Sequence, residues 1–223
     1  MPVAIESALL AEVLPEILVA ERKEKLGLDD IEQLTKEAEE AKNLQNYSKA
    51  IDLYERILEL KEKNFEPEHP DTAIYLTNLA GLYLDQGLYS KGESLVLRAL
   101  SIFEKVLGPE HKDTAISLNN LAFLYMKQGL YSKAEPLILR SLSIKEKVLG
   151  PEHPNTAITL NNLAELYLDQ GLYSKAEPLY LRALSIREKV LGPEHPDTAA
   201  FLDNLASIYS DQGLYSKAEP LYL

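Results

Sequence analysis

Apolar residues recur along the chain at the spacing of amphipathic helices. Between residues 112 and 127, Ala115, Leu118, Leu121, Ala122 and Tyr125 fall on one face of a helix. Gln128 and Gly129 then interrupt the pattern, and a glycine in the left-handed conformation commonly ends a helix. A second apolar stripe follows and comprises Leu137, Leu139, Leu142, Ile144 and Val148. The pattern therefore predicts two helices joined by a tight turn.

This helix pair repeats with a period of 42 residues. The period relates Tyr47, Tyr89, Tyr131, Tyr173 and Tyr215, the histidines His69, His111, His153 and His195, and the asparagines Asn78, Asn120, Asn162 and Asn204. A fixed period of this size is typical of a solenoid, in which each unit packs only on its neighbours. We predict an all-α solenoid of antiparallel helix pairs. Its repeats are a divergent first repeat at 29–68, repeats at 69–110, 111–152 and 153–194, and an incomplete fifth at 195–223.

Polar residues and prolines mark the predicted helix ends. Gly150 and Pro151 stop a second helix, His153 stands at the next N-cap, and Pro154 suits the first helical position. Ser132 is followed three residues later by Glu135, which is capping-box spacing. We therefore expect the second helix to begin at Ser132 with a reciprocal Ser–Glu pair.

Residues 1–28 carry a separate apolar stripe that glutamates interrupt. Its residues are Leu9, Leu10, Val13, Leu14, Ile17 and Leu18. A secretory signal would have a basic start and an unbroken apolar stretch, and this segment has neither. We expect an amphipathic helical segment that caps the first repeat; the alternative is a remnant of an upstream domain.

The charge balance restricts the partners. The net charge is −12 and the isoelectric point about 4.9, which argues against nucleic acid and against anionic membrane surfaces. No apolar run approaches the roughly 20 residues of a membrane-spanning helix. The chain has no cysteine, so a disulfide or thiolate metal site is excluded. A cytoplasmic location fits this composition.

The core residues resemble the tetratricopeptide repeat. They are Leu118, Leu121, Ala122, Tyr125, Gly129, Tyr131 and Ala134. The longer unit, with Leu-Asn-Asn-Leu-Ala at 160–164 and Ile-Arg-Glu-Lys-Val-Leu-Gly-Pro-Glu-His-Pro at 186–196, is similar to the kinesin light chain subtype, which also occurs in bacterial multidomain proteins. The resemblance implies a right-handed superhelix whose first helices line a concave groove. Residues 31–68 depart from it, with Glu37 for an apolar residue and Gln45 for glycine.

The resemblance places a peptide-binding groove on positions that differ between repeats. The candidate groove residues are Thr77, Asn119, Phe123, Met126, Asn161, Glu165, Leu168 and Asp203. Asn119 and Asn161 match asparagines with which the family holds a peptide backbone, since an amide both donates and accepts. Phe123 and Met126 form either an apolar floor or ordinary packing.

For two other polar positions near the groove, the sequence leaves two roles open. Lys145 and Arg187 either edge the groove or lie on a solvated helix face, whereas the second asparagine of each pair is expected to join neighbouring helices. Asp85, Glu165, Asp169, Asp203 and Asp211 make the groove acidic. The kinesin light chain groove accepts acidic peptides, so this charge favours a basic or mixed apolar peptide instead.

No residue pattern points to catalysis, a metal or a cofactor. Equivalent histidines of neighbouring repeats stand at least about 8–10 Å apart, too far to share a zinc ion. The two glycines of Gly87–Gly92 have phosphate-loop spacing, but Glu93 stands where that loop needs lysine. We therefore expect a protein that is not an enzyme and needs no cofactor.

The sequence thus predicts an interaction scaffold that binds an extended peptide. Because the chain stops partway through a second helix, at Leu223, we expect it to be the recognition part of a larger protein. The alternative is a regulatory repeat domain that docks on a signalling or catalytic domain of the same polypeptide. Self-association through the exposed C-terminal repeat is a further expectation.

Overall fold

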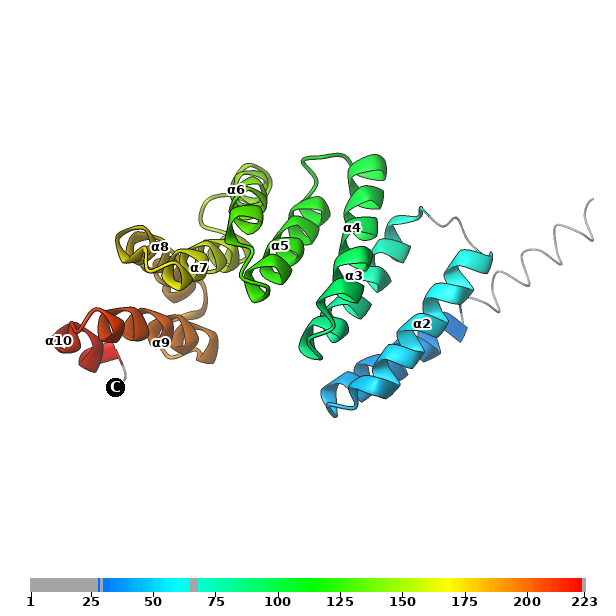
Figure 1. Ribbon diagram of the computed structural model, residues 1–223, viewed down its shortest axis with the longest axis horizontal. Coiled ribbons are helices and arrows are strands. Elements are labelled where there is room, and N and C mark those ends of the chain that lie inside the picture. The colour runs from blue at the N-terminus through cyan, green and yellow to red at the C-terminus, as the bar shows by residue number, and fades with distance from the viewer. Residues whose placement is uncertain (1–27, 29, 65–67, 222–223) are drawn as a thin grey trace, which may run out of the picture.

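The computed structural model describes residues 28, 30–64 and 68–221, and these are helices joined by short turns (Figure 1). The first helical segment covers residues 30–43 and precedes α2 (Tyr47–Asn64). The following pairs are α3 (Pro70–Asp85) with α4 (Tyr89–Val106), α5 (Lys112–Lys127) with α6 (Tyr131–Val148), and α7 (Pro154–Asp169) with α8 (Tyr173–Leu191). The last elements are α9 (Pro196–Asp211), α10 (Tyr215–Ala218) and the 3₁₀ turn η1 (Glu219–Leu221).

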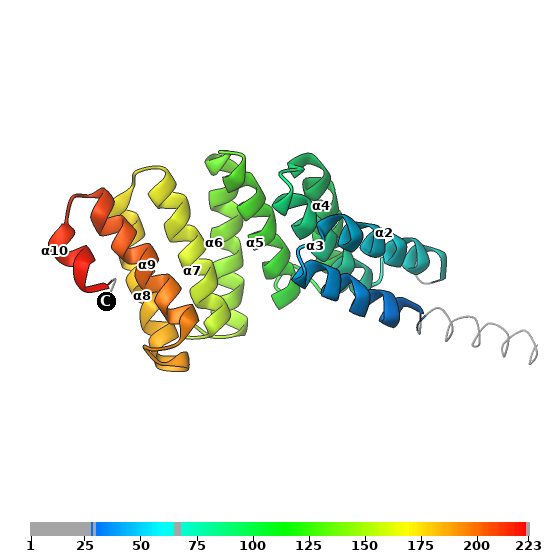
Figure 2. The same cartoon turned by 90° about the horizontal axis from the view of Figure 1, so that it is seen from below.

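The helices stack in sequence order, which confirms the predicted all-α solenoid. Each first helix packs on the second helix of its own repeat, and each second helix also packs on the next first helix (Figure 2). First helices of neighbouring repeats also contact each other, α3 with α5 and α5 with α7. This contact places the first helices on the inner side of the right-handed superhelix. The predicted capping segment lies outside the described residues, apart from Leu28.

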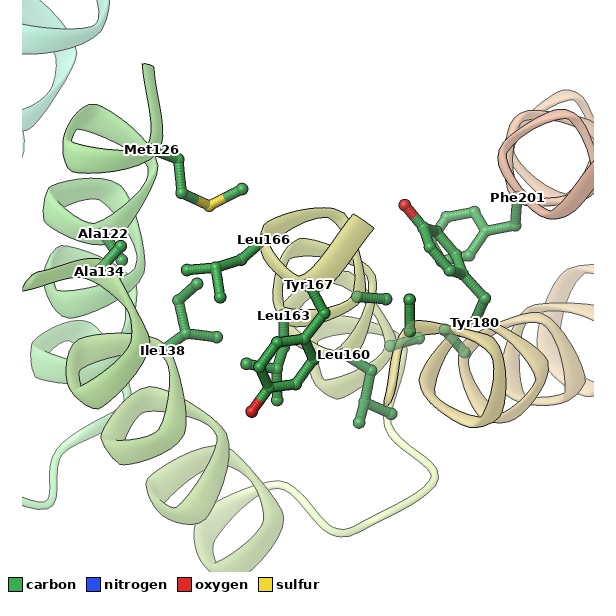
Figure 3. Packing of buried hydrophobic residues seen from close by; sticks show 14 of the residues in the cluster. Ala122, Met126, Ala134, Ile138, Leu160, Leu163, Leu166, Tyr167, Tyr180 and Phe201 are labelled. Carbon is green, nitrogen blue, oxygen red and sulfur yellow. The ribbon is translucent and has the colours of Figure 1, made fainter. Parts of the chain in front are cut away.

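The core repeats with the sequence. Ala122 and Ala134 are completely buried where α5 crosses α6, and their small side chains let the two helices approach closely. Leu160, Leu163 and Leu166 of α7 fill the space between this repeat and the next (Figure 3). Within the part of the chain that is described, no helix is both long and apolar enough to cross a membrane.

The predicted histidine caps are present. The Nδ1 atoms of His69, His111 and His153 accept hydrogen bonds from the backbone N–H two residues later, at 3.2, 3.2 and 3.1 Å. Pro154 occupies the first turn of α7, and Gly129 has a φ of +72° at the end of α5. These contacts satisfy backbone groups that a helix end would otherwise leave unpaired.

The predicted capping box is wrong. Helix α6 begins at Tyr131, and its N-cap is Leu130, which makes no side-chain capping bond. Glu135 instead accepts a hydrogen bond from the Tyr167 hydroxyl of the next repeat, at 2.8 Å. The same bond joins Tyr125 to Glu93 and Tyr209 to Glu177. A buried hydroxyl needs an acceptor, so the glutamate holds neighbouring repeats together rather than capping its own helix.

Candidate functional site

The first helices present a row of exposed apolar side chains on the inner face. Ile74, Ile116 and Ile158 occupy equivalent positions and are 48%, 40% and 39% exposed. Exposed isoleucine is costly in water, because each buried CH₂ contributes about 0.8 kcal/mol. A repeated row of this kind therefore marks a surface suited to contact with a partner.

Two adjoining hollows lie between α3 and α5 on this face. The first has a volume of about 290 Å³, and its walls include Thr77, Gly81, Asp85, Asn120 and Phe123. The second has a volume of about 270 Å³ and is lined by Ile74, Thr77, Asn78, Phe103, Asp113 and Ile116. Because Thr77 and Asn78 belong to both, the hollows are neighbouring parts of one groove.

Gly81 opens the first hollow without a packing reason for a glycine. It lies in the interior of α3, where glycine is about 1 kcal/mol less favourable than alanine. A Cβ atom added at Gly81 would meet nothing within 4 Å, whereas one at Gly92 would meet the Ala80 carbonyl oxygen at 3.3 Å. The contact of α4 with α3 is therefore tight at Gly92, although the equivalent Ala134 carries a Cβ, whereas no packing contact accounts for a glycine at position 81.

Phe123 and Glu165 are joined through Lys127. The Lys127 ammonium lies 4.8 Å from the centre of the Phe123 ring and 3.9 Å from Glu165 Oε1 on α7. Burial raises the pKa of the Glu165 carboxyl, Lys127 opposes this shift, and Asp169 adds to it. The groove wall between α5 and α7 thus carries an aromatic ring and a cation beside partly buried carboxylates.

The two candidate asparagines differ in their surroundings. Asn119 is 8% exposed, and its Oδ1 atom has no hydrogen-bond partner among the described residues. Asn161 Oδ1 accepts a hydrogen bond from Asn204 Nδ2 of the next repeat at 3.1 Å. Asn78 similarly bonds the Tyr54 hydroxyl of α2. At Asn78 and Asn204, the second asparagine of the pair therefore connects neighbouring repeats.

The remaining candidates are dispersed. Met126 is 5% exposed, and its side chain extends from α5 toward α7 (Figure 3), so it fills core space. Leu168 is partly buried and packs against the same core. Asp203 is exposed on α9 and lines neither hollow. Thr77 and Phe123 are the two candidates that the structure brings to one hollow.

Lys145 and Arg187 lie neither at the groove edge nor on a solvated face, because they are only 4% and 8% exposed. The Lys145 ammonium donates to Thr159 Oγ1 at 2.7 Å, and burial lowers its pKa to about 8. The Arg187 guanidinium lies 5.2 Å from the centre of the Phe201 ring. Their aliphatic stems lie in the core, and their charged ends meet the next repeat's first helix.

The family model of the tetratricopeptide repeat matches residues 38–91, 74–125, 113–189 and 164–223. The chain belongs to the tetratricopeptide repeat family. No match was found among curated proteins. Repeats of this family form scaffolds that commonly mediate protein–protein interaction.

Solved structures support the kinesin light chain subtype. A Podosopora anserina putative kinesin light chain with nearly identical repeats is 26% identical to this chain. That match covers 86% of this chain and 90% of the other, with a TM-score of 0.70. BtubC (BKLC) from P. vanneervenii shares the fold at 23% identity over 91% of this chain and 87% of its own, with a TM-score of 0.72.

The fold likeness extends to a Rap protein, for which the TM-score is 0.76 at 20% identity. That match covers 88% of this chain and 53% of the Rap chain. Within the described residues, no three histidine, aspartate or glutamate side chains are grouped so that they could hold a metal ion.

Proposed function

We propose that the inner face binds an extended peptide segment of a partner protein. The observation that carries this proposal is the pair of adjoining hollows between α3 and α5, which open beside the exposed row Ile74, Ile116 and Ile158. Side chains of a peptide would fill the hollows, and the role needs no catalytic group or cofactor. We also propose that the chain serves as the recognition part of a larger cytoplasmic protein.

Polar groups support binding through the peptide backbone. The Oδ1 atom of Asn119 is buried, and Asn119 lines neither hollow, so the peptide contact that the family resemblance implies for it would need its side chain to turn outward. Asn161 uses its Oδ1 atom for Asn204, which leaves its amide nitrogen to donate to a backbone carbonyl. Thr77 donates its hydroxyl to the Ala73 carbonyl at 2.8 Å, so we assign it a shaping role.

Charge supports a basic or mixed apolar peptide. Asp85 lines the first hollow together with Lys42, Asp113 is, among the described residues, the one charged residue that lines the second, and Glu165 pairs with Lys127 beside Phe123. A cationic peptide is attracted by this field, which raises the association rate and selects against acidic sequences. The Rap protein of similar fold was solved in complex with Competence and Sporulation Factor, so a chain of this fold does hold a partner.

Selection from a phage-displayed library of random dodecapeptides tests the proposal. Enriched peptides are titrated against the wild type, Phe123→Ala and Leu139→Ala. Phe123 borders the first hollow, whereas Leu139 is 45% exposed on the second helix α6. We expect Phe123→Ala to weaken binding by about tenfold, in the range of a buried aromatic contact. Leu139→Ala should change it by less than about twofold.

Two outcomes would overturn the proposal. One is a selection in which no peptide is enriched on the folded protein above the background obtained with the same protein unfolded in urea. The other is a peptide whose affinity responds to Leu139→Ala and not to Phe123→Ala. Thermal unfolding followed by circular dichroism shows whether each variant retains its fold.

A further inference from the structure

At three of the four junctions between repeats in the described part of the chain, the second helix of one repeat places a long cationic side chain against the first helix of the next. The fourth junction is an exception. The positions related by the 42-residue period are Lys61, Phe103, Lys145 and Arg187. Lys61 Nζ lies 3.5 Å from Asp71 Oδ2 and 5.6 Å from the centre of the Tyr75 ring. Lys145 contacts Thr159, and Arg187 contacts the Phe201 ring. Phe103 stands alone among them as an uncharged residue.

Phe103 stands where the other repeats have a lysine or arginine. As a result, two polar side chains of α5 lack the cationic partner that the equivalent side chains of other repeats have. Asp113 corresponds to Asp71, yet no lysine or arginine lies within ion-pair distance of it in the described part of the chain. Ser117 corresponds to Thr159, which receives the Lys145 ammonium. Its hydroxyl is fully buried and has no hydrogen-bond partner among the described residues.

His111 does not neutralise Asp113. Its Nδ1 atom lies 3.6 Å from Asp113 Oδ2, but the same atom accepts the backbone N–H of Asp113 at 3.2 Å. A ring nitrogen that accepts this hydrogen bond carries no proton and offers the carboxylate no donor. Asp113, in the first turn of α5, therefore has no cationic side chain of the described residues paired with it.

This carboxylate belongs to the second hollow of the groove. Phe103, Ile74 and Ile116 supply apolar walls, and the Asp113 side chain is 30% exposed at the same hollow of about 270 Å³. A hollow that combines apolar side chains with one carboxylate suits a long aliphatic stem with a cationic end, the form of arginine and lysine side chains.

We propose that the hollow between Ile74, Phe103, Asp113 and Ile116 takes the side chain of an arginine or lysine from a bound peptide. The partner thereby supplies, at the junction of α4 with α5, the cation that other junctions carry in the chain itself. This inference rests on the proposed peptide-binding function and adds to it the residue type that the groove selects.

Two substitutions remove the pocket's selectivity in different ways. Asp113→Asn deletes the charge, and Phe103→Lys supplies the cation internally, as Lys145 does in the following repeat. Glu152→Gln makes the same charge change at an exposed carboxylate that pairs with Lys189, and it serves as the control. Circular dichroism melting confirms that each variant is folded.

The probes are peptides enriched from the displayed dodecapeptide library, each synthesised with its arginine or lysine and again with norleucine at that position. For the wild type, we expect the cationic peptide to bind about tenfold more tightly than its norleucine form, as for a charge-assisted hydrogen bond. In Asp113→Asn and in Phe103→Lys, this ratio should fall below about twofold, whereas Glu152→Gln should keep it.

The outcomes separate this inference from the function on which it rests. If no peptide is enriched, both fail together. If peptides bind and Phe123→Ala weakens them, but the norleucine exchange has no effect or Asp113→Asn keeps the full ratio, the groove stands and the cation pocket is refuted. The cation pocket would also be refuted if Glu152→Gln abolished the preference for the cationic peptide. Loss of a distant negative charge would then have the same effect as loss of Asp113.

Discussion

The ammonium of Lys145 lies 2.7 Å from the hydroxyl of Thr159 and has no carboxylate within ion-pair distance in the described part of the chain. The backbone carbonyl of Asn155 lies 3.4 Å from the same ammonium. Asn155 is equivalent to Asp71, the carboxylate that pairs with Lys61 of the first repeat. Burial without an opposite charge disfavours the ammonium and lowers the Lys145 pKa to about 8.

This contact predicts a stability that rises with pH. Lysine in the unfolded chain keeps its ordinary pKa of about 10.4 and binds its proton more tightly than buried Lys145 does. Between pH 8 and that value the unfolded state holds more protons, so the free energy of unfolding increases as pH rises. Urea denaturation at about pH 7 and about pH 9.5 should show the increase in the wild type.

The substitution Lys145→Met removes this dependence. We expect it to stabilise the protein by about 1 kcal/mol at neutral pH, because the desolvated charge is lost while the stem volume is kept. The gain should shrink toward pH 9.5. Lys147→Met is the matched control on the same helix, since Lys147 is exposed and pairs with Glu110. Equal effects of the two substitutions would contradict the assignment.

Gln45 is predicted to strain the turn after the first helical segment. Its φ is +57°, and it is the one non-glycine residue with positive φ in the described part of the chain. Gly87 occupies the equivalent position in the next repeat with a φ of +71°. Gln45→Gly should raise the free energy of unfolding by about 0.5–1 kcal/mol, because left-handed backbone costs other residues about 1–2 kcal/mol.

Gln86 supplies the control for that turn. It has a φ of −93° at the end of α3, where glycine offers no relief. Gln86→Gly should therefore leave stability unchanged or lower it. A stabilising Gln86→Gly, or a destabilising Gln45→Gly, would argue against strain at residue 45.

Alanine in place of Gly81 should raise the free energy of unfolding. Gly81→Ala adds a methyl group to open space and should stabilise α3 by about 0.5–1 kcal/mol in urea denaturation. If Gly81 keeps the groove open, the stabilised Gly81→Ala variant should also bind selected peptides less tightly than the wild type.

The bond from Tyr167 to Glu135 predicts alkaline sensitivity. Burial, followed by the Glu135 carboxylate, raises the pKa of Tyr167 from 10.0 to about 12. Its contribution to stability is therefore complete below pH 10 and is lost as pH rises toward 12. Tyr167→Phe should cost about 1 kcal/mol at neutral pH and lessen the alkaline loss. Tyr173→Phe, at a half-buried ring, should have little effect on either.

The core positions and the histidine caps were predictable from the sequence, whereas the roles of Glu135 and Lys145 at the junctions were not. The spacing of Leu118, Ala122 and Tyr125 places the core, and His153 with Pro154 marks the start of α7. The partner of Glu135 and the burial of Lys145 depend on side chains of the following repeat. Lysine in a helical pattern is ordinarily exposed, so only the stacked structure reveals that this one is buried.

The shape of the two hollows was not predictable from the sequence. The difference between repeats at Thr77 and Phe123 indicated the inner face, and both residues line the first hollow. Gly81 lines the first hollow, and Phe103, which stands where other repeats carry a cation, lines the second. The hollows become apparent only when the surroundings of equivalent residues in different repeats are compared in the structure.

Photo-crosslinking of a selected dodecapeptide tests the central claim most directly. A benzoylphenylalanine is introduced in place of Phe123 on α5 or Leu139 on α6, and the products are identified by mass spectrometry. If an extended peptide lies along the inner face, position 123 crosslinks to it, unlabelled peptide competes, and position 139 gives background only. Crosslinking at position 139 with none at position 123, in two folded variants, would contradict the account.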